Sequence, residues 1–256
     1  FTHVLVVVFE NREANEVAGS PQAPTFRALG RRYATLTNYD AVAHPSLPNY
    51  LALVSGSTQV ITSDCTDCVV SARNLADTLV AAGRTWKTYA EGLPYPGFTG
   101  ASADDYALKH DPFLYFRDVR SSKTRRRNVV PLTQLARDVA RRRLPDFALV
   151  VPDLCHDMHD CTVATGDTWL RRHIRPLLGS PALAGGVVFV VFDEGTSSEG
   201  GGGNVEALAL GPAVRSGSAF SLRTNHYGLL RTIEDAWGLP RLGQSRTATP
   251  IGGIWK

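Results

Sequence analysis

The chain has 256 residues, 43% of them hydrophobic and 20% charged, which is ordinary for an enzyme-sized globular chain with a sizeable core, and we expect one domain over 1–256. Its longest apolar run, at 4–9, is far too short to cross a bilayer, so we predict no transmembrane segment. The net charge of +3 rests on arginine runs at 124–127 and 141–143, which lack interleaved aromatic residues; they predict solvated surface, or alternatively a landing site for anionic lipid, but not nucleic-acid binding.

Apolar runs and helical patterns alternate along the chain. Buried parallel strands are predicted at 3–9, 146–151 and 186–192, with weaker strand patterns at 85–91 and 205–211. Helical patterns lie at 22–34, 47–55, 72–82, 132–143, 167–178 and 225–237, with Asp167 as the expected N-cap of the fifth. This alternation predicts an α/β fold with a doubly wound, mostly parallel central sheet flanked by helices.

Acidic residues follow each of the three strong strands, which end in "FEN", "PDLCHDMHD" and "FDEG". Because open parallel sheets bind ligands beyond the carboxyl ends of their strands, Glu10, Asp153 or Asp157, and the pair Asp193 and Glu194 are expected at one edge. Neighbouring carboxylates repel, and a divalent cation is the simplest balance for their charge. Carboxylates mixed with histidine suit zinc, iron or manganese, whereas carboxylates with an Asn carbonyl would also suit calcium.

A candidate nucleophile lies in "AHPSLPNYLALVSG", where a predicted helix begins close to Ser46. The unpaired N–H groups and the dipole at a helix N-terminus favour an anion such as phosphate. The alternative is that Ser46 only caps the helix. The acids at the strand ends supply the partner that favours a nucleophile.

The four cysteines form two closely spaced pairs, Cys65 with Cys68 and Cys155 with Cys161. Two short-range disulfides in an exported protein are favoured over a zinc site built from Cys and His. The chain begins at Phe1 rather than at a methionine, as expected for a processed or trimmed terminus. We therefore predict a secreted or extracytoplasmic protein.

Six motifs in order carry a resemblance to a known family: "VVVFENRE", "HPSLPNYLALVSG", "KHDPFLYF", "PDLCHDMHDCTVATGDTWL", "VVFDEG" and "NHYGLLRTIEDAWGLP". Together they resemble the phosphoesterase family of bacterial phospholipases C and acid phosphatases, within the alkaline phosphatase superfamily. The resemblance extends over nearly the whole chain. It implies an alkaline-phosphatase-like fold and a metal-dependent phosphoric-ester hydrolase that acts on phosphate mono- or diesters, phospholipids included.

The resemblance also implies roles for individual residues. Ser46 matches the family's nucleophile, whose hydroxyl would contact a metal and form a phosphoseryl intermediate. The implied metal ligands are Glu10, Asn11, Ser46, Asp193 and Glu194, with Asp157 and Asp153 as further candidates. The histidines implied to hold phosphate or to protonate the leaving group are His110, His159 and His226. Asp153 and His156 stay open between metal ligand, support for a histidine, and surface.

One departure from the family pattern indicates which branch of the family the chain resembles, and two alternative functions remain. No Asp-His pair follows Asp193 and Glu194, which favours the shorter, acid-phosphatase-like branch. A sulfatase- or mutase-like activity within the superfamily is disfavoured, because residues 46–50 read "SLPNY" and carry no sulfatase signature. The non-enzymatic alternative is a calcium-stabilised module that binds anionic lipid without catalysis. The sequence gives no prediction of the oligomeric state.

Overall fold

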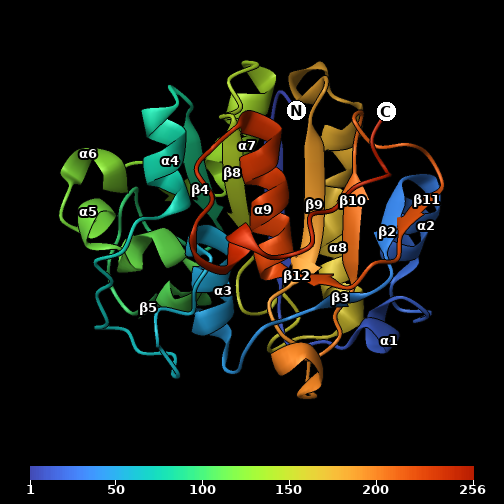
Figure 1. Ribbon diagram of the computed structural model, residues 1–256, viewed down its shortest axis with the longest axis horizontal. Helices are drawn as coiled ribbons and strands as arrows, with labels where there is room; N and C mark the ends of the chain where they lie inside the picture. Colours follow the sequence, from blue (N-terminus) through green and yellow to red (C-terminus); the bar gives the residue numbers. More distant parts are fainter.

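An eight-stranded sheet forms the centre of the computed structural model, which describes residues 1–256 (Figure 1). From edge to edge its strands are β11 (Ser218–Phe220), β2 (Ala34–Leu36), β10 (Ala207–Leu210), β9 (Val187–Phe192), β1 (Val4–Phe9), β8 (Phe147–Val151), β4 (Trp86–Ala90) and β7 (Val129–Pro131). Only β10 runs antiparallel to its neighbours, β9 and β2. The predicted α/β fold with a large, mostly parallel sheet is confirmed, while its doubly wound connectivity stays a prediction.

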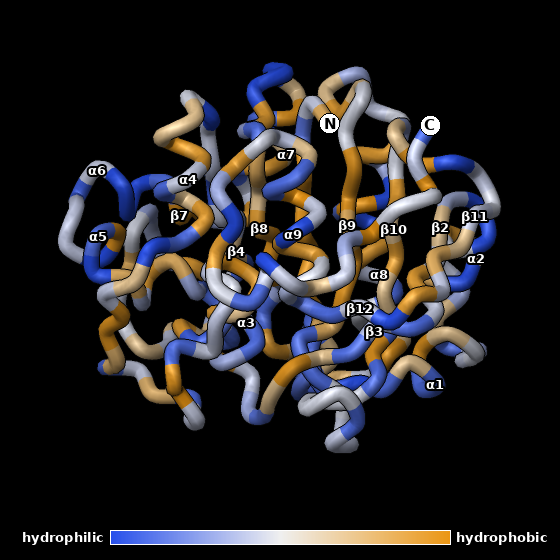
Figure 2. Tube along the Cα trace, viewed as in Figure 1, coloured by the Kyte–Doolittle hydropathy of each residue, from blue (hydrophilic) through white to orange (hydrophobic).

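The central strands β9, β1 and β8 lie side by side and parallel, and all their residues are buried. Figure 2 shows them as hydrophobic stretches inside a more polar surround. Valines and phenylalanines dominate them, as expected for strands covered on both faces. Because Phe9 pairs with Phe192, the acids that follow, Glu10 and Asp193, leave the sheet at the same level.

Helices cover the sheet on either side. The helices are α1 (Ala14–Val17), α2 (Pro24–Arg32), α3 (Ser46–Ser55), α4 (Leu75–Ala81), α5 (Arg117–Arg120), α6 (Lys123–Arg126), α7 (Thr133–Ala140), α8 (Val163–His173) and α9 (His226–Trp237). Figure 1 shows α9 in front of the sheet and α8 behind it. Helix α3, which begins at Ser46, packs against α9.

Two small sheets complete the regular structure. Strand β3 (Tyr39–Asp40) pairs in parallel with β12 (Thr224–Asn225), and β5 (Ser102–Ala103) pairs with β6 (Tyr106–Ala107) as an antiparallel ribbon. The β3–β12 pair brings the segment before Ser46 beside the start of α9, and these two segments are far apart in the sequence.

The fifth helix differs from its prediction. Helix α8 begins at Val163, because the Thr162 hydroxyl accepts a hydrogen bond from Thr165 N at 3.3 Å and so acts as the N-cap. The prediction of Asp167 as N-cap is therefore wrong. Asp167 lies inside α8, and its Oδ1 atom accepts the N–H groups of Thr25 at 2.7 Å and Phe26 at 3.0 Å. It thus caps the neighbouring helix α2 in place of its own.

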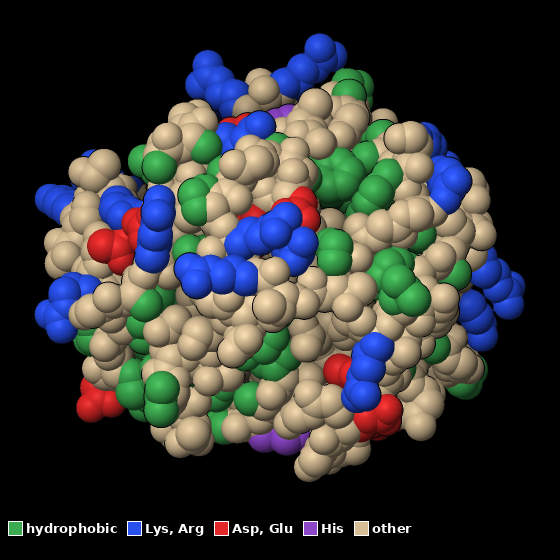
Figure 3. Space-filling view, in the orientation of Figure 1, with side chains coloured by type: hydrophobic (Ala, Val, Ile, Leu, Met, Phe, Trp, Pro, Cys, Tyr) green, Lys and Arg blue, Asp and Glu red, His purple; other side chains and the backbone are tan.

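The surface shows no single basic patch formed by the two arginine runs. One run lies in and just after α6 and the other just after α7, and Figure 1 shows these helices apart. Figure 3 likewise shows Lys and Arg side chains at several separate points on this face. Within the first run, Arg125 pairs with Asp77 at 2.8 Å and with Asp118 at 2.5 Å. None of the helices combines the length and apolar composition needed to cross a bilayer.

Candidate active site

Four carboxylates from three strand ends gather at one edge of the sheet. Glu10, Asp157 and Asp193 are fully buried, and Glu194 is 5% exposed. Backbone hydrogen bonds fix their mutual position, since Glu10 N donates to Asp157 O at 2.8 Å and Asp193 N donates to Phe9 O at 2.9 Å. The Asp193 carboxylate accepts Asn11 N at 3.2 Å.

Ser46 lies against this group of acids. Its hydroxyl donates to Glu10 Oε2 at 3.1 Å and, alternatively, to Glu194 Oε1 at 3.3 Å. Asn11 contributes its Nδ2 atom, which is 3.4 Å from the same Glu10 oxygen. The five residues expected as principal metal ligands, Glu10, Asn11, Ser46, Asp193 and Glu194, are thus brought together by the fold.

The loop before Ser46 is fixed by a buried side chain of α3. Asn49 Oδ1 accepts the N–H groups of Val42 at 3.0 Å and Ala43 at 3.1 Å, and its Nδ2 donates to Ala43 O at 2.8 Å. Because Asn49 has no exposure, these bonds hold the incoming chain against the first turn of the helix. The position of the Ser46 hydroxyl is therefore set by the fold rather than by solvent.

Burial and mutual repulsion dominate the electrostatics of the acids. Burial, together with the neighbouring charge of Glu10, raises the pKa of Asp157 to about 9 and raises that of Asp193 well above its ordinary range. Burial also acts against the charged form of Glu10, but His110 and Lys109 outweigh it and lower the Glu10 pKa to about 2. Without a further positive charge, this group of acids does not ionise fully at neutral pH.

Several oxygens of these acids have no hydrogen-bond partner. They are Glu10 Oε1, Asp157 Oδ2 and Asp193 Oδ2, of which the first two lie near the ring nitrogens of His110, within ion-pair distance but outside hydrogen-bond geometry. A buried carboxylate oxygen without a hydrogen bond is costly, and a bound ion is one of the explanations for such an atom in a native structure. The residues at this edge therefore fit a divalent cation.

His110 lies between two of the acids. Its Nε2 atom is 2.7 Å from Glu10 Oε1, and its Nδ1 atom is 3.4 Å from Asp157 Oδ2. Its ring stacks on Tyr50 at a centroid distance of 5.1 Å, and the residue is only 2% exposed. His110 thus belongs to the same cluster, with both ring nitrogens directed at carboxylates.

His226 lies at the start of α9 and is fully buried. Its Nε2 atom bonds to Asp193 O at 2.6 Å, and its Nδ1 atom bonds to the Tyr39 hydroxyl at 3.0 Å. Burial lowers the pKa of His226 to about 4, so the ring is neutral near pH 7. Because both nitrogens are engaged within the protein, this geometry suits a residue that positions the Asp193 backbone.

All four cysteines form disulfides, Cys155 with Cys161 and Cys65 with Cys68, so the alternative of a Cys-ligated zinc site is wrong.

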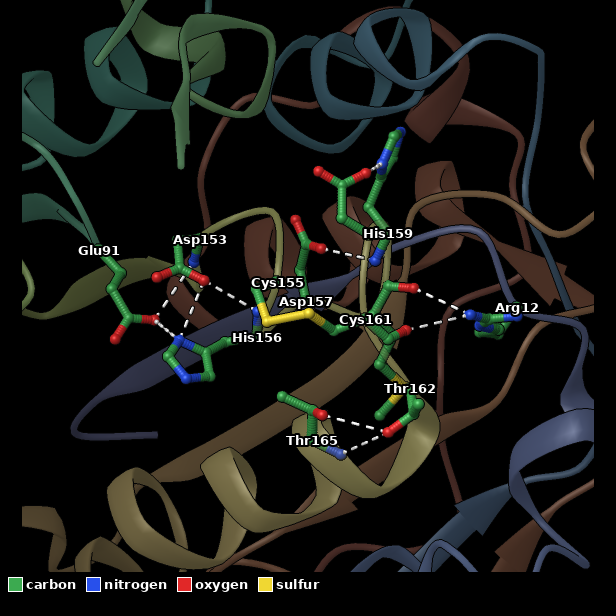
Figure 4. The surroundings of a disulfide bond; sticks show 12 residues. Arg12, Glu91, Asp153, Cys155, His156, Asp157, His159, Cys161, Thr162 and Thr165 are labelled. Atoms are coloured by element: carbon green, nitrogen blue, oxygen red, sulfur yellow. Dashed lines mark hydrogen bonds and ion pairs between the residues drawn. A yellow bond between two sulfur atoms is a disulfide. The ribbon is translucent and has the colours of Figure 1, made fainter. Parts of the chain in front are cut away.

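The side chains of the segment that follows β8 point in two directions from the Cys155–Cys161 disulfide (Figure 4). Asp157 and His159 extend to one side of the first disulfide. His159 N donates to Asp157 Oδ1 at 2.8 Å, and its Nδ1 bonds to Asp160 at 2.6 Å.

Asp153 and His156 extend to another side and meet Glu91 (Figure 4). The ligand atoms of these three residues lie within 4.8 Å of one another. His156 Nδ1 is 3.1 Å from Glu91 and 2.9 Å from Asp153, and Trp169 Nε1 donates to Glu91 at 2.8 Å. The acids of this group are thus bonded within the protein. The structure places Asp157, rather than Asp153, among the acids around Ser46.

Three further residues reach the site. Lys109 and Asp64 were not predicted there, and His44 was expected only as structural support for the turn at Ser46. His44 bonds through Nδ1 to Glu194 Oε2 and through Nε2 to Ser197 O, the latter at 2.9 Å. Lys109 Nζ is 3.3 Å from Ser46 Oγ, and Asp64 is 3.2 Å from the same ammonium group. The quoted motifs contain His44 and Lys109, and their polar side chains next to Ser46 and His110 were the available signal.

Comparisons with known proteins agree on the family of this chain. The model of the phosphoesterase family matches residues 20–240. The phosphatidylinositol-3-phosphatase of Mycobacterium tuberculosis is 34% identical over 258 residues, which cover 100% of this chain and 83% of that protein. A probable acid phosphatase of Kluyveromyces lactis and an acid phosphatase of Aspergillus fumigatus are each 31% identical over 95% of this chain, which spans 60% and 56% of their lengths.

Solved structures show the same fold at low identity. An alkaline phosphatase superfamily protein from Vibrio parahaemolyticus superposes with a TM-score of 0.65 at 12% identity, over 98% of this chain and 70% of that one. A lipoteichoic acid synthase from Listeria monocytogenes gives 0.64 at 12% identity, over 97% and 76%. The resemblance stated from the six motifs is confirmed. The chain belongs to the phosphoesterase family, whose members hydrolyse phosphate ester bonds.

Proposed function

We propose that the chain is a secreted, metal-dependent phosphomonoesterase in which Ser46 is the nucleophile. One observation carries this proposal: the Ser46 hydroxyl is bonded to Glu10 and Glu194 at an edge where three buried carboxylate oxygens make no hydrogen bond. Relatives named as phosphatases support the reaction class, and the two disulfides support an oxidising compartment.

The residues that would hold the metal are Glu10, Asn11, Ser46, Asp193 and Glu194, with Asp157 beside them. These donors are mainly carboxylates, which suit zinc, iron, manganese or calcium. When bound, a divalent cation would lower the pKa of the Ser46 hydroxyl and offset negative charge on the phosphate.

The chain's own residues account for the proton of the nucleophile. Glu10 is engaged by His110 and Lys109, which leaves Glu194 as the freer acceptor for the Ser46 proton. The second Glu194 oxygen bonds to His44, whose side chain is 37% exposed. We assign Glu194, supported by His44, as the group that accepts this proton as Ser46 Oγ attacks phosphorus.

His159 is the proposed proton donor to the leaving oxygen. Its Nδ1 atom is bonded to Asp160, so Nε2 is the nitrogen left to face a substrate, and its side chain is 32% exposed. The bond from phosphorus to the leaving oxygen breaks as the bond to Ser46 Oγ forms, and His159 supplies the proton. Water then attacks the phosphoserine and gives a proton to His159, while Glu194 returns its proton to Ser46 as phosphate leaves.

The two buried histidines act by positioning. His110 holds the Glu10 and Asp157 carboxylates, and His226 holds the backbone of Asp193. In place of the proton donation expected for His226, we propose that it stays neutral and fixes the strand end.

The proposed substrates are phosphate monoesters. The M. tuberculosis relative carries the name of a phosphatidylinositol-3-phosphatase and the fungal relatives are named acid phosphatases, and all these names describe phosphatases. Release of phosphate from a lipid headgroup and from a small monoester use the same chemistry at Ser46. We therefore propose monoester hydrolysis in preference to the diester cleavage of a phospholipase C.

Replacing Ser46 by Ala tests the proposal directly. After removal and re-addition of divalent metal, Ser46→Ala should lose at least about 10³-fold in kcat on p-nitrophenyl phosphate while remaining folded. Ser63→Ala, at an exposed serine nearby, is the matched control and should keep full activity. Full activity in Ser46→Ala would contradict the proposal.

Ser46→Ala also distinguishes the proposed enzyme from the alternative function, a calcium-stabilised module that binds lipid without catalysis. A module should bind anionic vesicles in a calcium-dependent manner and show no metal-dependent release of phosphate, whether or not Ser46 is present. Turnover that needs both metal and Ser46 would exclude that alternative.

A further inference from the structure

Lys109 is a cation in direct contact with the candidate nucleophile. It belongs to the 3₁₀-helix Leu108–His110, next to His110. Its Nζ atom lies 3.3 Å from Ser46 Oγ, 3.2 Å from Asp64 Oδ2 and 3.9 Å from Glu10 Oε2. Its side chain is 16% exposed, whereas Glu10 beneath it has no exposure. Lys109 therefore lies where solvent and the buried acids meet.

Asp64 fixes this lysine relative to the helix that carries Ser46. Its Oδ1 atom accepts Leu47 N, in the first turn of α3, at 2.9 Å, while its Oδ2 atom accepts the Lys109 ammonium. The next residue, Cys65, is tied to Cys68 by a disulfide. One carboxylate thus links the start of α3, the lysine and a cross-linked loop, which keeps the ammonium beside the serine oxygen.

A purely structural ion pair does not account for all of these contacts. The Asp64 carboxylate alone would satisfy a surface lysine, and Glu10 already has His110 at 2.7 Å. The Lys109 ammonium also donates to Ser46 Oγ, the atom that would bond to phosphorus. Charge-assisted donors placed where negative charge develops are among the largest contributions to catalysis.

We propose that Lys109 is a further catalytic residue, whose ammonium group donates to Ser46 Oγ and to a non-bridging oxygen of the phosphoryl group during transfer. This role rests on the proposed function. Lys109 keeps its proton throughout and makes no bond to the leaving oxygen. It stabilises the charge on the attacking and transferring oxygens, and Asp64 positions it.

Lys109→Met tests this role, with Lys123→Met, at an exposed lysine on α6, as the matched control. We expect Lys109→Met to lose about 10²-fold in kcat and the control to keep wild-type kcat. The loss should be the same for p-nitrophenyl phosphate and for glycerol phosphate, because Lys109 does not act on the leaving group. Removal of a group that protonates the leaving oxygen would instead lower kcat far more on glycerol phosphate, the alkyl ester, than on p-nitrophenyl phosphate.

Two further measurements separate catalysis from a structural effect. Added ethylammonium should restore part of the activity of Lys109→Ala by supplying the missing cation. Asp64→Asn keeps an oxygen for Leu47 N but loses the carboxylate charge, and it should cost about tenfold with an unchanged melting temperature. Lys109→Met activity within threefold of wild type, or a loss confined to the alkyl ester, would overturn the proposal.

The failure of this inference is distinguishable from that of the proposed function. If Ser46→Ala is inactive while Lys109→Met is fully active, Ser46 chemistry stands and the role of Lys109 falls. If Ser46→Ala retains activity, both fall. A Lys109→Met protein that does not fold is replaced in the test by Lys109→Gln, and the same dependence on the leaving group decides the outcome.

Discussion

Asp157 is a carboxylate that would ionise freely in water but is buried beside Glu10 and His110. Its Oδ2 atom makes no hydrogen bond, and burial raises the pKa of Asp157 to about 9. Asp157 therefore binds a proton in the folded, metal-free protein over a pH range in which the unfolded chain has lost it. Unfolding then releases protons, so stability falls as pH rises from about 4 towards 9. A bound cation removes this penalty by pairing with the ionised acid.

The variant Asp157→Asn is expected to stabilise the metal-free protein but to weaken its stabilisation by metal. In chelator, it should raise the melting temperature at pH 8 by several degrees and weaken the decline of stability with pH, since each pKa unit is worth about 1.4 kcal/mol. With zinc or manganese added, it should show a smaller metal-induced rise in melting temperature than the wild type. Thermal melts at pH 5 and pH 8 check this, and equal pH slopes for both proteins would count against it.

The positions of the site residues could be predicted from the sequence to different extents. Glu10, Asp193 and Glu194 follow long apolar strands, so the sequence places them at the edge of a parallel sheet. Lys109 and Asp64 could not be placed, because their approach to Ser46 depends on the paths of loops between elements. Loop paths carry no periodic signal in the sequence.

At the level of elements, the loop from β8 to α8 presents Asp157 and His159 together (Figure 4). The Cys155–Cys161 disulfide closes this loop, and the Arg12 guanidinium donates to Met158 O at 3.1 Å and to Cys161 O at 3.2 Å. The second disulfide holds the loop of Asp64 in a comparable way. The two cross-links therefore support different parts of the proposed reaction.

Removing each disulfide should produce a different kinetic defect. Cys155→Ala/Cys161→Ala should lose about 2 kcal/mol of stability, and its kcat should fall more on glycerol phosphate than on p-nitrophenyl phosphate because His159 is displaced. Cys65→Ala/Cys68→Ala should slow both substrates equally through Asp64 and Lys109. Kinetics on the two esters, with chemical denaturation as the stability measurement, check this pair; identical leaving-group dependence in the two variants would refute it.

The elements themselves were predictable where they are long. The apolar patterns at 3–9, 146–151 and 186–192 correspond to β1, β8 and β9. Strands β2, β7 and β11, with three residues each, are too short to show a period, and only the neighbouring strands give them a place. The start of α8 was misplaced because an Asp used to cap another helix has the same sequence signature as an N-cap.

At the level of the whole molecule, the sheet order explains why distant segments share one site. Strands β9, β1 and β8 are adjacent and parallel, so acids separated by more than a hundred residues leave the sheet at one edge, and α3 brings Ser46 to the same place. The fold class followed from the alternation of patterns, and the family from motifs in order. The partners of each side chain at the site required the three-dimensional structure.

The most direct test of the central claim is to trap the enzyme during turnover. The protein is mixed with p-nitrophenyl phosphate and divalent metal, quenched in acid within the first turnovers and digested, and the peptide containing Ser46 is examined by mass spectrometry. Phosphate attached at Ser46, present with metal and lost in chelator, is the predicted result. Steady turnover with no phosphoserine at Ser46, or turnover undiminished after metal removal, would contradict the account.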